Sequence, residues 1–151
     1  YFRANVWWWR PVWSFISQHC DDILTEEDIQ KGSYNDAHLI SKTKAKKIAS
    51  RIRKLSKDGT IKETQSWYDK ASKKAKKIND KVDIKLEELQ REVEKLTNNA
   101  KIAPCDYPIE HKNKWETIYN SRNNTSDYPF DSEFLLRFGR FCDDSGGFEI
   151  C

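Results

Sequence analysis

The sequence contains no methionine, and several features that would define a class of protein are missing as well. Because methionine is absent, we expect the natural start of the chain to lie upstream. No apolar run approaches the ~20 residues of a membrane-spanning helix, which excludes such a helix, and no secretory signal is visible. The four cysteines form no C-x-x-C pair, and no glycine motif typical of phosphate or dinucleotide binding occurs.

Glycine and proline are also scarce, and neither occurs between residues 60 and 99. Apolar residues recur there at every third or fourth position, which predicts a long helix over 60–99 with a narrow, coiled-coil-like stripe. Shorter helices are expected after Pro11, over 109–120 and after Asp131. We see no convincing strand, although two short extended segments could pair. The expected class is all-α, a compact single domain over 1–151 with a long antiparallel or coiled-coil-like central helix.

Positive charge is concentrated in the middle of the chain. Residues 41–101 hold 19 lysines and arginines against 9 acidic residues, while the remainder holds 8 against 15. This asymmetry is typical of a solvated lysine-rich face, of a basic middle that folds onto acidic ends, or of a surface for an anionic partner. We expect Cys20 and Cys142 to be reduced thiols on apolar helix faces in a cytoplasmic protein.

Four of the six tryptophans lie within the seven residues from 7 to 13. Pro11 suits the first turn of a helix, so Trp7, Trp8 and Trp9 would precede that helix in an extended or irregular segment. Alternate side chains of such a segment point in opposite directions, so at least one indole should lie at a surface. We assign Trp13 to the core.

Two arginines flank these tryptophans. An exposed indole beside Arg3 or Arg10 could stack on a base while the guanidinium binds a phosphate. The alternative is a packed N-terminal anchor with the arginines lying over aromatic faces. Both interpretations remain open, and the first makes Arg3, Arg10 and the three adjacent tryptophans candidate ligand-binding residues.

A second candidate site is the group Asn35, Asp36 and His38, whose side chains together can bind hydroxyl or amide groups of a ligand. Its alternative is an ordinary turn before a helix. Residues 144–147, Asp-Ser-Gly-Gly, are similar to the nucleophile segment of trypsin-like serine proteases, but Gly-Gly after a helix more simply ends it. The histidines and cysteines lack metal-ligand spacing, so we expect neither a metal site nor a cofactor.

The strings YFRANVWWWRPVW, CDDILTEED, YNDAHLI and the terminal YPF and DSGGFEIC resemble an uncharacterised family of small bacterial and phage-type proteins. The resemblance covers residues 1–55 and 127–151. It implies no mechanism, because no activity is attached to that family. Relatives carry paired C-x-x-C motifs suggestive of zinc in the middle, where this chain has its lysine-rich helix, so no zinc site is carried over.

Three functional hypotheses follow. The first is a non-enzymatic protein that binds a nucleotide-like, anionic small molecule, which in a phage-type protein could sequester a host signalling nucleotide. The second is a protein–protein module, most simply a two-fold homodimer, because the long stripe cannot bury itself and the other helices are short. The third is a weak, sequence-independent nucleic-acid binder using residues 41–81, although no known binding motif is present. An enzyme is the least supported class.

Overall fold

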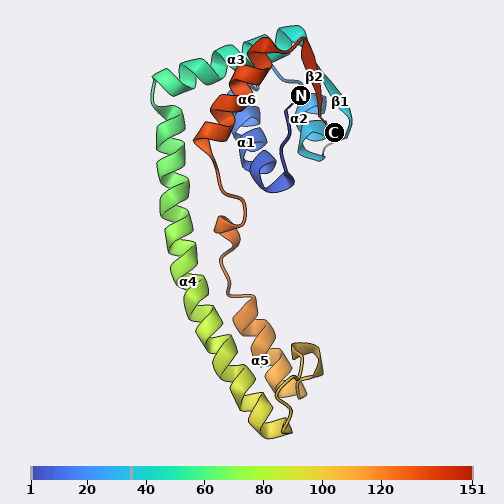
Figure 1. The fold of residues 1–151 in the computed structure, drawn as a ribbon, viewed down its shortest axis with the longest axis vertical. Coiled ribbons are helices and arrows are strands. Elements are labelled where there is room, and N and C mark those ends of the chain that lie inside the picture. The colour runs from blue at the N-terminus through green and yellow to red at the C-terminus, as the bar shows by residue number, and fades with distance from the viewer. Residues whose placement is uncertain (1, 35, 151) are drawn as a thin grey trace. The chain divides into compact units, whose positions relative to one another are not determined.

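The computed structural model describes residues 2–34 and 36–150, apart from the side chain of Ser126 (Figure 1). Within these residues the chain forms six α-helices, two short 3₁₀-helices and one two-stranded sheet, which confirms the predicted all-α class. The chain divides into two compact units. Unit 1 comprises Tyr1–Asp69 and Asp127–Cys151, and unit 2 comprises Lys70–Ser126. The single domain over 1–151 stays a prediction, and each unit is described by itself.

The first helix of unit 1 begins earlier than the sequence predicted. Helix α1 runs Val6–His19, with Asn5 as its N-cap. The Asn5 side-chain oxygen accepts a hydrogen bond of 3.1 Å from the Trp8 backbone N–H, which satisfies one of the free donors at the helix start. Pro11 therefore lies inside the helix and leaves the carbonyl of Trp7 without its usual donor. The prediction of an extended segment over residues 7–9 is wrong.

The tryptophans of α1 pack against α2, which runs Glu26–Tyr34. Trp13 is only 1% exposed, which confirms its assignment to the core. Its indole N–H donates to the Ile29 carbonyl at 3.1 Å, and that of Trp9 donates to the Gly32 carbonyl at 2.8 Å. A Cβ at Gly32 would lie 2.3 Å from the Trp13 ring, so only glycine allows this close contact.

A small antiparallel sheet connects the two ends of the chain. Strand β1 (His38–Ser41) pairs with β2 (Gly147–Ile150), and Ile40 lies opposite Phe148. The two extended segments that the sequence allowed to pair thus do pair, and the apolar C-terminal end docks on the core. Gly147 has φ +106° and its missing Cβ would lie 2.8 Å from the Ile40 carbonyl, so glycine is required at this turn.

Two further helices complete unit 1. Helix α3 runs Lys42–Lys57, and α6 runs Ser132–Asp144 with Asp131 as its N-cap. Their apolar faces pack together beside α1 and the sheet (Figure 1). The most deeply buried aliphatic and aromatic side chains of this core are Val12, Trp13, Ile16, Ile40, Ile48, Leu135 and Phe138.

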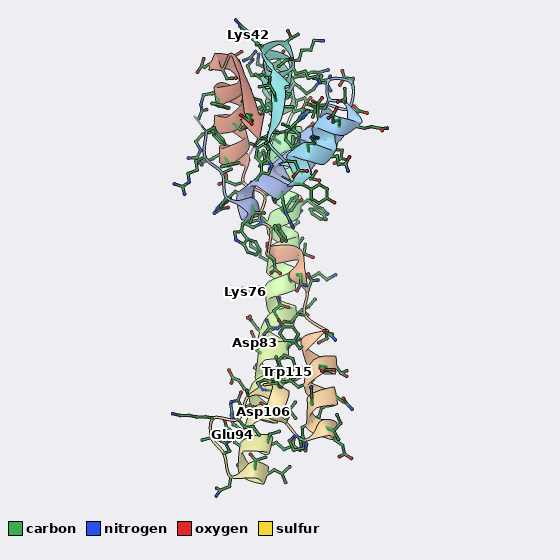
Figure 2. The ribbon with its side chains drawn as sticks, turned by 90° about the vertical axis from the view of Figure 1, so that its right-hand side faces the viewer. Lys42, Lys76, Asp83, Glu94, Asp106 and Trp115 are labelled. Carbon is green, nitrogen blue, oxygen red and sulfur yellow. The ribbon has the colours of Figure 1, made fainter. Side chains whose placement is uncertain are left out.

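The long helix α4 runs Thr60–Thr97, as predicted, and most of it belongs to unit 2. Beyond the short helix η1 (Pro104–Asp106), α5 (Ile109–Tyr119) lies alongside the last part of α4 (Figures 1 and 2). Helix η2 (Asn124–Ser126) follows, and the Asn79 side chain holds the preceding loop through two hydrogen bonds to the Asn123 backbone of 3.0 and 2.8 Å.

Unit 2 has its own small core. Leu89, Val93 and Tyr107 are buried, and Trp115 and Ile118 of α5 pack against them. The chain itself therefore covers this part of the long apolar stripe, contrary to the argument on which a second copy was expected. A homodimer stays a prediction, without that support. None of the helices in residues 2–34 and 36–150 combines the length and apolarity that crossing a membrane requires.

Candidate functional site

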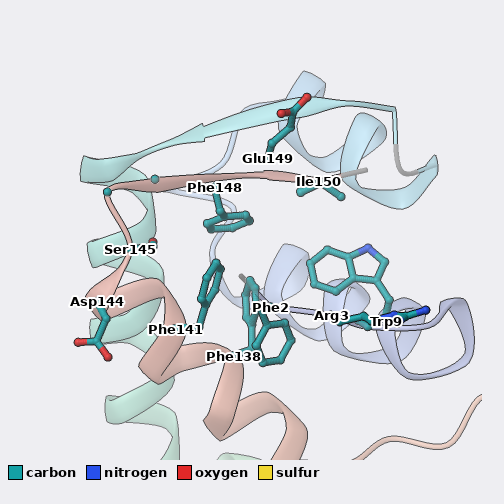
Figure 3. A pocket seen from close by; sticks show the side chains of 13 residues that line it. Phe2, Arg3, Trp9, Phe138, Phe141, Asp144, Ser145, Phe148, Glu149 and Ile150 are labelled. Atoms are coloured by element: carbon teal, nitrogen blue, oxygen red, sulfur yellow. The ribbon is translucent and has the colours of Figure 1, made fainter.

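Unit 1 contains a pocket of about 670 Å³ with five aromatic residues among those that line it (Figure 3). We call it the aromatic pocket. Its walls come from the N-terminal segment, from α1, from α6 and from the turn that leads into β2. The lining residues are Phe2, Arg3, Ala4, Trp9, Phe138, Phe141, Asp144, Ser145, Gly146, Gly147, Phe148, Glu149 and Ile150.

The rings of the pocket contact one another in edge and tilted arrangements. Phe2 lies 5.3 Å from Phe138 and 5.4 Å from Phe141, measured between ring centroids. Phe148 lies 5.4 Å from Phe138 and 5.8 Å from Phe141. Trp9 meets the ring of Phe138 edge-on at 5.4 Å. These contacts bury Trp9, Phe138 and Phe148, whereas Phe2 and Phe141 remain half-buried and keep apolar surface toward the pocket.

Successive side chains of β2 point to opposite faces of the strand, and this decides which of them face the pocket rings. Phe148 and Ile150 are buried on one face of the strand, whereas Glu149 is exposed on the other. Figure 3 shows the Glu149 carboxylate on the far side of the strand from Phe148, and the Asp144 carboxylate directed away from the rings. Neither carboxylate therefore faces the aromatic rings.

Arg3 is the one cation among the described residues that line the pocket. Its side chain is exposed, lies beside Trp9 in Figure 3, and forms no ion pair within the described part of the chain. Together with Asp144 and Glu149, the residues that line the pocket carry one positive and two negative charges.

The serine of the Asp-Ser-Gly-Gly segment shows no arrangement for catalysis. The Ser145 hydroxyl donates a hydrogen bond of 3.3 Å to the Cys142 carbonyl, and its backbone N–H caps the end of α6 by donating to Phe141 at 2.9 Å. A nucleophilic serine needs a base within hydrogen-bond reach. This segment ends a helix, as the sequence indicated.

Of the tryptophan–arginine group predicted from the sequence, the structure brings only Arg3 and Trp9 to the aromatic pocket. Trp9 is 6% exposed, whereas Trp7 and Trp8 are 49% and 37% exposed. This confirms that at least one of the three indoles lies at the surface. The helix causes the split, because successive side chains of α1 are turned by about 100° from one another.

Arg10 is engaged outside the pocket. Its guanidinium donates to the Tyr128 hydroxyl at 3.1 Å and lies over the Tyr128 ring, 5.4 Å from the centroid. The Trp7 ring lies 5.0 Å from the same tyrosine, and Trp8 lies 6.5 Å from Phe134. This is the arrangement of a packed anchor, the alternative interpretation of the cluster.

The second predicted group is not brought together as a site in the described residues. Asn35 lies outside the described residues, and Asp36 is exposed, with its backbone N–H donating to Lys31 at 3.1 Å. His38 is engaged within the protein, because its Nε2 lies 2.8 Å from an Asp28 carboxylate oxygen. The three residues stay a prediction as a ligand site, but His38 has a structural partner.

Asp28 is the centre of a buried polar cluster that the sequence did not indicate. The side chain is 2% exposed, forms an ion pair with Lys44 and shares a hydrogen bond with His38. It also accepts a hydrogen bond of 2.7 Å from the Thr25 backbone N–H. Burial alone would raise the pKa of Asp28, but the hydrogen bonds from Lys44, Thr25 and His38 outweigh it and hold this pKa well below its usual range.

In the sequence, Asp28 stands three residues after Thr25, a spacing typical of a helix cap, and nothing there indicates its other partners. Its partners lie on β1 and α3, and no local pattern links those positions. Across residues 2–34 and 36–150, no group of three or more histidine, cysteine or acidic side chains is placed to hold a metal ion.

The cysteines differ sharply in environment, which predicts selective alkylation. Cys20 and Cys142 are buried, whereas Cys105 is exposed. Burial raises the pKa of Cys20 to about 11 and also raises that of Cys142, so few thiolates form at neutral pH. We expect iodoacetamide to modify Cys105 at least about tenfold faster than Cys20 or Cys142 in the native protein. Peptide mass spectrometry measures the rates, with denatured protein as the control.

Equal rates at the three positions of the native protein would contradict the burial of Cys20 and Cys142. A faster reaction at either buried cysteine would instead indicate an activated nucleophile.

No protein-family model matches the sequence, and comparisons with curated proteins and with solved structures give no match either. The resemblance to an uncharacterised family of small bacterial and phage-type proteins stays a prediction. The function proposed below therefore depends on the geometry of the site itself.

Proposed function

We propose that this chain is a non-enzymatic binding protein whose aromatic pocket takes a planar, nucleotide-like small molecule with one anionic group. The observation that carries the proposal is the pocket of about 670 Å³ lined by Phe2, Trp9, Phe138, Phe141 and Phe148, with Arg3 at its rim. This volume lies within the range of about 300–1,000 Å³ that is usual for small-molecule sites.

Each part of the pocket has a role in this proposal. The half-buried rings of Phe2 and Phe141 provide apolar surface for a flat base, and base–aromatic stacking contributes about 1–3 kcal/mol per base. The Arg3 guanidinium provides a fixed positive charge, because it does not titrate in proteins. Asp144 and Glu149 disfavour additional phosphates through like-charge repulsion. A nucleoside monophosphate or a cyclic mononucleotide therefore fits better than a triphosphate.

The experiment is calorimetric titration with a nucleoside, its monophosphate, its cyclic monophosphate and its triphosphate. We expect the monophosphate or cyclic monophosphate to bind most tightly. Arg3→Ala should lower the affinity for that ligand by about 10- to 100-fold, as loss of a charge-assisted hydrogen bond does. It should leave the affinity for the nucleoside unchanged. Phe2→Ala should lower the affinities for the nucleoside and for its monophosphate by the same factor, because it removes stacking area from both complexes.

Arg10→Ala is the matched control, because Arg10 contacts Tyr128 and does not line the pocket. It should leave all affinities unchanged. If no compound in the series binds, or if Arg10→Ala weakens binding as much as Arg3→Ala, the aromatic pocket is not a nucleotide site.

A further inference from the structure

Unit 2 carries a row of lysines on the solvent side of α4. Five exposed lysines lie at helical spacing and form what we call the lysine stripe: Lys70, Lys73, Lys74, Lys77 and Lys81. At 100° per residue, all five fall within an arc of about 100°, and they extend over roughly 16 Å of helix axis. Ala75 and Val82 on the same helix are buried and lie toward the other side. The stripe therefore faces away from the packed face of α4.

The excess of positive over negative charge in unit 2 is confined to residues 70–81. Residues 70–81 hold six lysines against one acid, Asp80, whereas residues 82–126 hold seven basic and eight acidic residues. Lys76, labelled in Figure 2, is also exposed and lies beside the stripe on α4. The rest of unit 2 is close to neutral, so the stripe dominates its electrostatic field.

None of the stripe lysines has an ionic partner within the described residues, whereas Lys114 and the two arginines of unit 2 are paired. Arg91 pairs with Glu87, Lys114 pairs with Glu92, and Arg122 pairs with Asp83. No ion pair reaches any stripe lysine in residues 2–34 and 36–150.

Repulsion within the stripe adds to this contrast. Lys70 and Lys74 are four residues apart, as are Lys73 and Lys77, and like charges at this spacing destabilise a helix. Alternating acidic and basic residues would stabilise the same helix better. The arrangement therefore favours an external partner with closely spaced negative charges.

We infer that the lysine stripe binds the phosphate backbone of double-stranded DNA without regard to sequence. Duplex DNA presents one negative charge per ~1.7 Å, which offers about ten phosphates over the length of the stripe. Lysine binds phosphate as a point charge, and residues 70–81 contain no arginine for bidentate reading of bases. Single-strand binding relies on aromatic rings for stacking, and residues 70–81 contain none.

The test is fluorescence anisotropy with two 20-base-pair duplexes of unrelated sequence, measured across salt concentrations. We expect equal affinities for the two duplexes. If four to five phosphates are contacted, the slope of log K against log salt should be about −4, and affinity should fall on the order of a hundredfold between 50 and 200 mM salt. The triple variant Lys73→Gln/Lys74→Gln/Lys77→Gln should weaken binding at least tenfold and reduce the slope by about 3.

The matched control removes the same charge from unit 1 through Lys42→Gln/Lys46→Gln/Lys57→Gln, three exposed lysines of α3. We expect it to keep most of the affinity. Equal losses in the two triple variants would show that net charge alone is responsible and would overturn the proposal. Glutamine has nearly the helix propensity of lysine, so circular dichroism should show both variants folded.

Three further outcomes would overturn the proposal: no binding at 50 mM salt, tighter binding to single-stranded DNA of the same length, or displacement of the duplex by polyglutamate at equal charge concentration. The last would indicate an acidic protein partner. Nucleotide titrations of the stripe variant should match those of the wild type, because the aromatic pocket lies in unit 1. The two proposals therefore fail independently.

Discussion

Replacing Trp13 by alanine is expected to lower the free energy of unfolding by about 3–5 kcal/mol, the usual range for a large aromatic residue removed from a core. Trp13 is 1% exposed and stacks on Trp9 at 5.1 Å between ring centroids. The Trp13 ring also packs directly against Gly32 of α2, where a Cβ atom would lie only 2.3 Å from the ring. Alanine at this position would leave a cavity between α1 and α2. Urea unfolding followed by circular dichroism measures the loss in the free energy of unfolding.

Trp7→Ala is the matched control for Trp13→Ala. It removes the same side chain from the same helix, but Trp7 is 49% exposed and contacts Tyr128 at the surface. We expect its effect to stay below about 1.5 kcal/mol, because less apolar surface is uncovered. Equal effects of the two variants would contradict the division of the cluster into a core member and a surface member.

Replacing Asp28 by alanine is expected to lower the free energy of unfolding by about 3 kcal/mol, the lower end of the range for breaking a buried ion pair. The carboxylate is 2% exposed, whereas its partners Lys44 and His38 retain side-chain exposures of 29% and 17% and can still reach water. The variant also removes the acceptor for the Thr25 N–H at the start of α2.

Glu27→Ala is the control for Asp28→Ala, because Glu27 lies on the same helix with its side chain 67% exposed. Its ion pair with Lys31, at 3.9 Å, should contribute less than about 1 kcal/mol. A loss in Glu27→Ala as large as that in Asp28→Ala would contradict the role of burial.

The Asp28 cluster also predicts how stability depends on pH. The pKa of Asp28 is lowered in the folded state, so its ion pair with Lys44 and its hydrogen bonds contribute stability above the unfolded pKa of about 3.9. That contribution is lost as the pH falls through the folded pKa. The difference in free energy of unfolding between wild type and Asp28→Asn should therefore be constant near neutral pH and shrink below about pH 4. A difference that stays constant down to pH 2 would contradict a charged Asp28.

The helices were largely predictable because their signals are local. The three-and-four spacing of apolar residues located α4, and Asp131 marked the start of α6. The start of α1 was misjudged because three adjacent tryptophans show no periodicity. Pro11 did not locate the start either, because proline fits the first turn of a helix and also the interior of a helix that tolerates one lost hydrogen bond. The Asn5 cap was the signal that could have located this start.

The candidate site was predictable only in part. Arg3 and Trp9 were expected from the density of tryptophan and arginine near the N-terminus, and both line the aromatic pocket. The rings of Phe138 and Phe148 come from α6 and β2, so no local pattern could associate them with Trp9. Arg10 was predicted as a ligand-binding residue together with Arg3, but its position on α1 directs the side chain toward Tyr128 instead.

The sequence by itself determined the helical class, the long helix, the burial of Trp13 and the concentration of lysine in the middle of the chain. These follow from periodicity, composition and charge, which act between neighbours in the chain. The tertiary structure alone decided the pairing of β1 with β2, the contacts of Asp28 with Lys44 and His38, and the closure of the aromatic pocket. Each of these joins residues far apart in sequence, whose meeting depends on how the helices pack and not on any local preference.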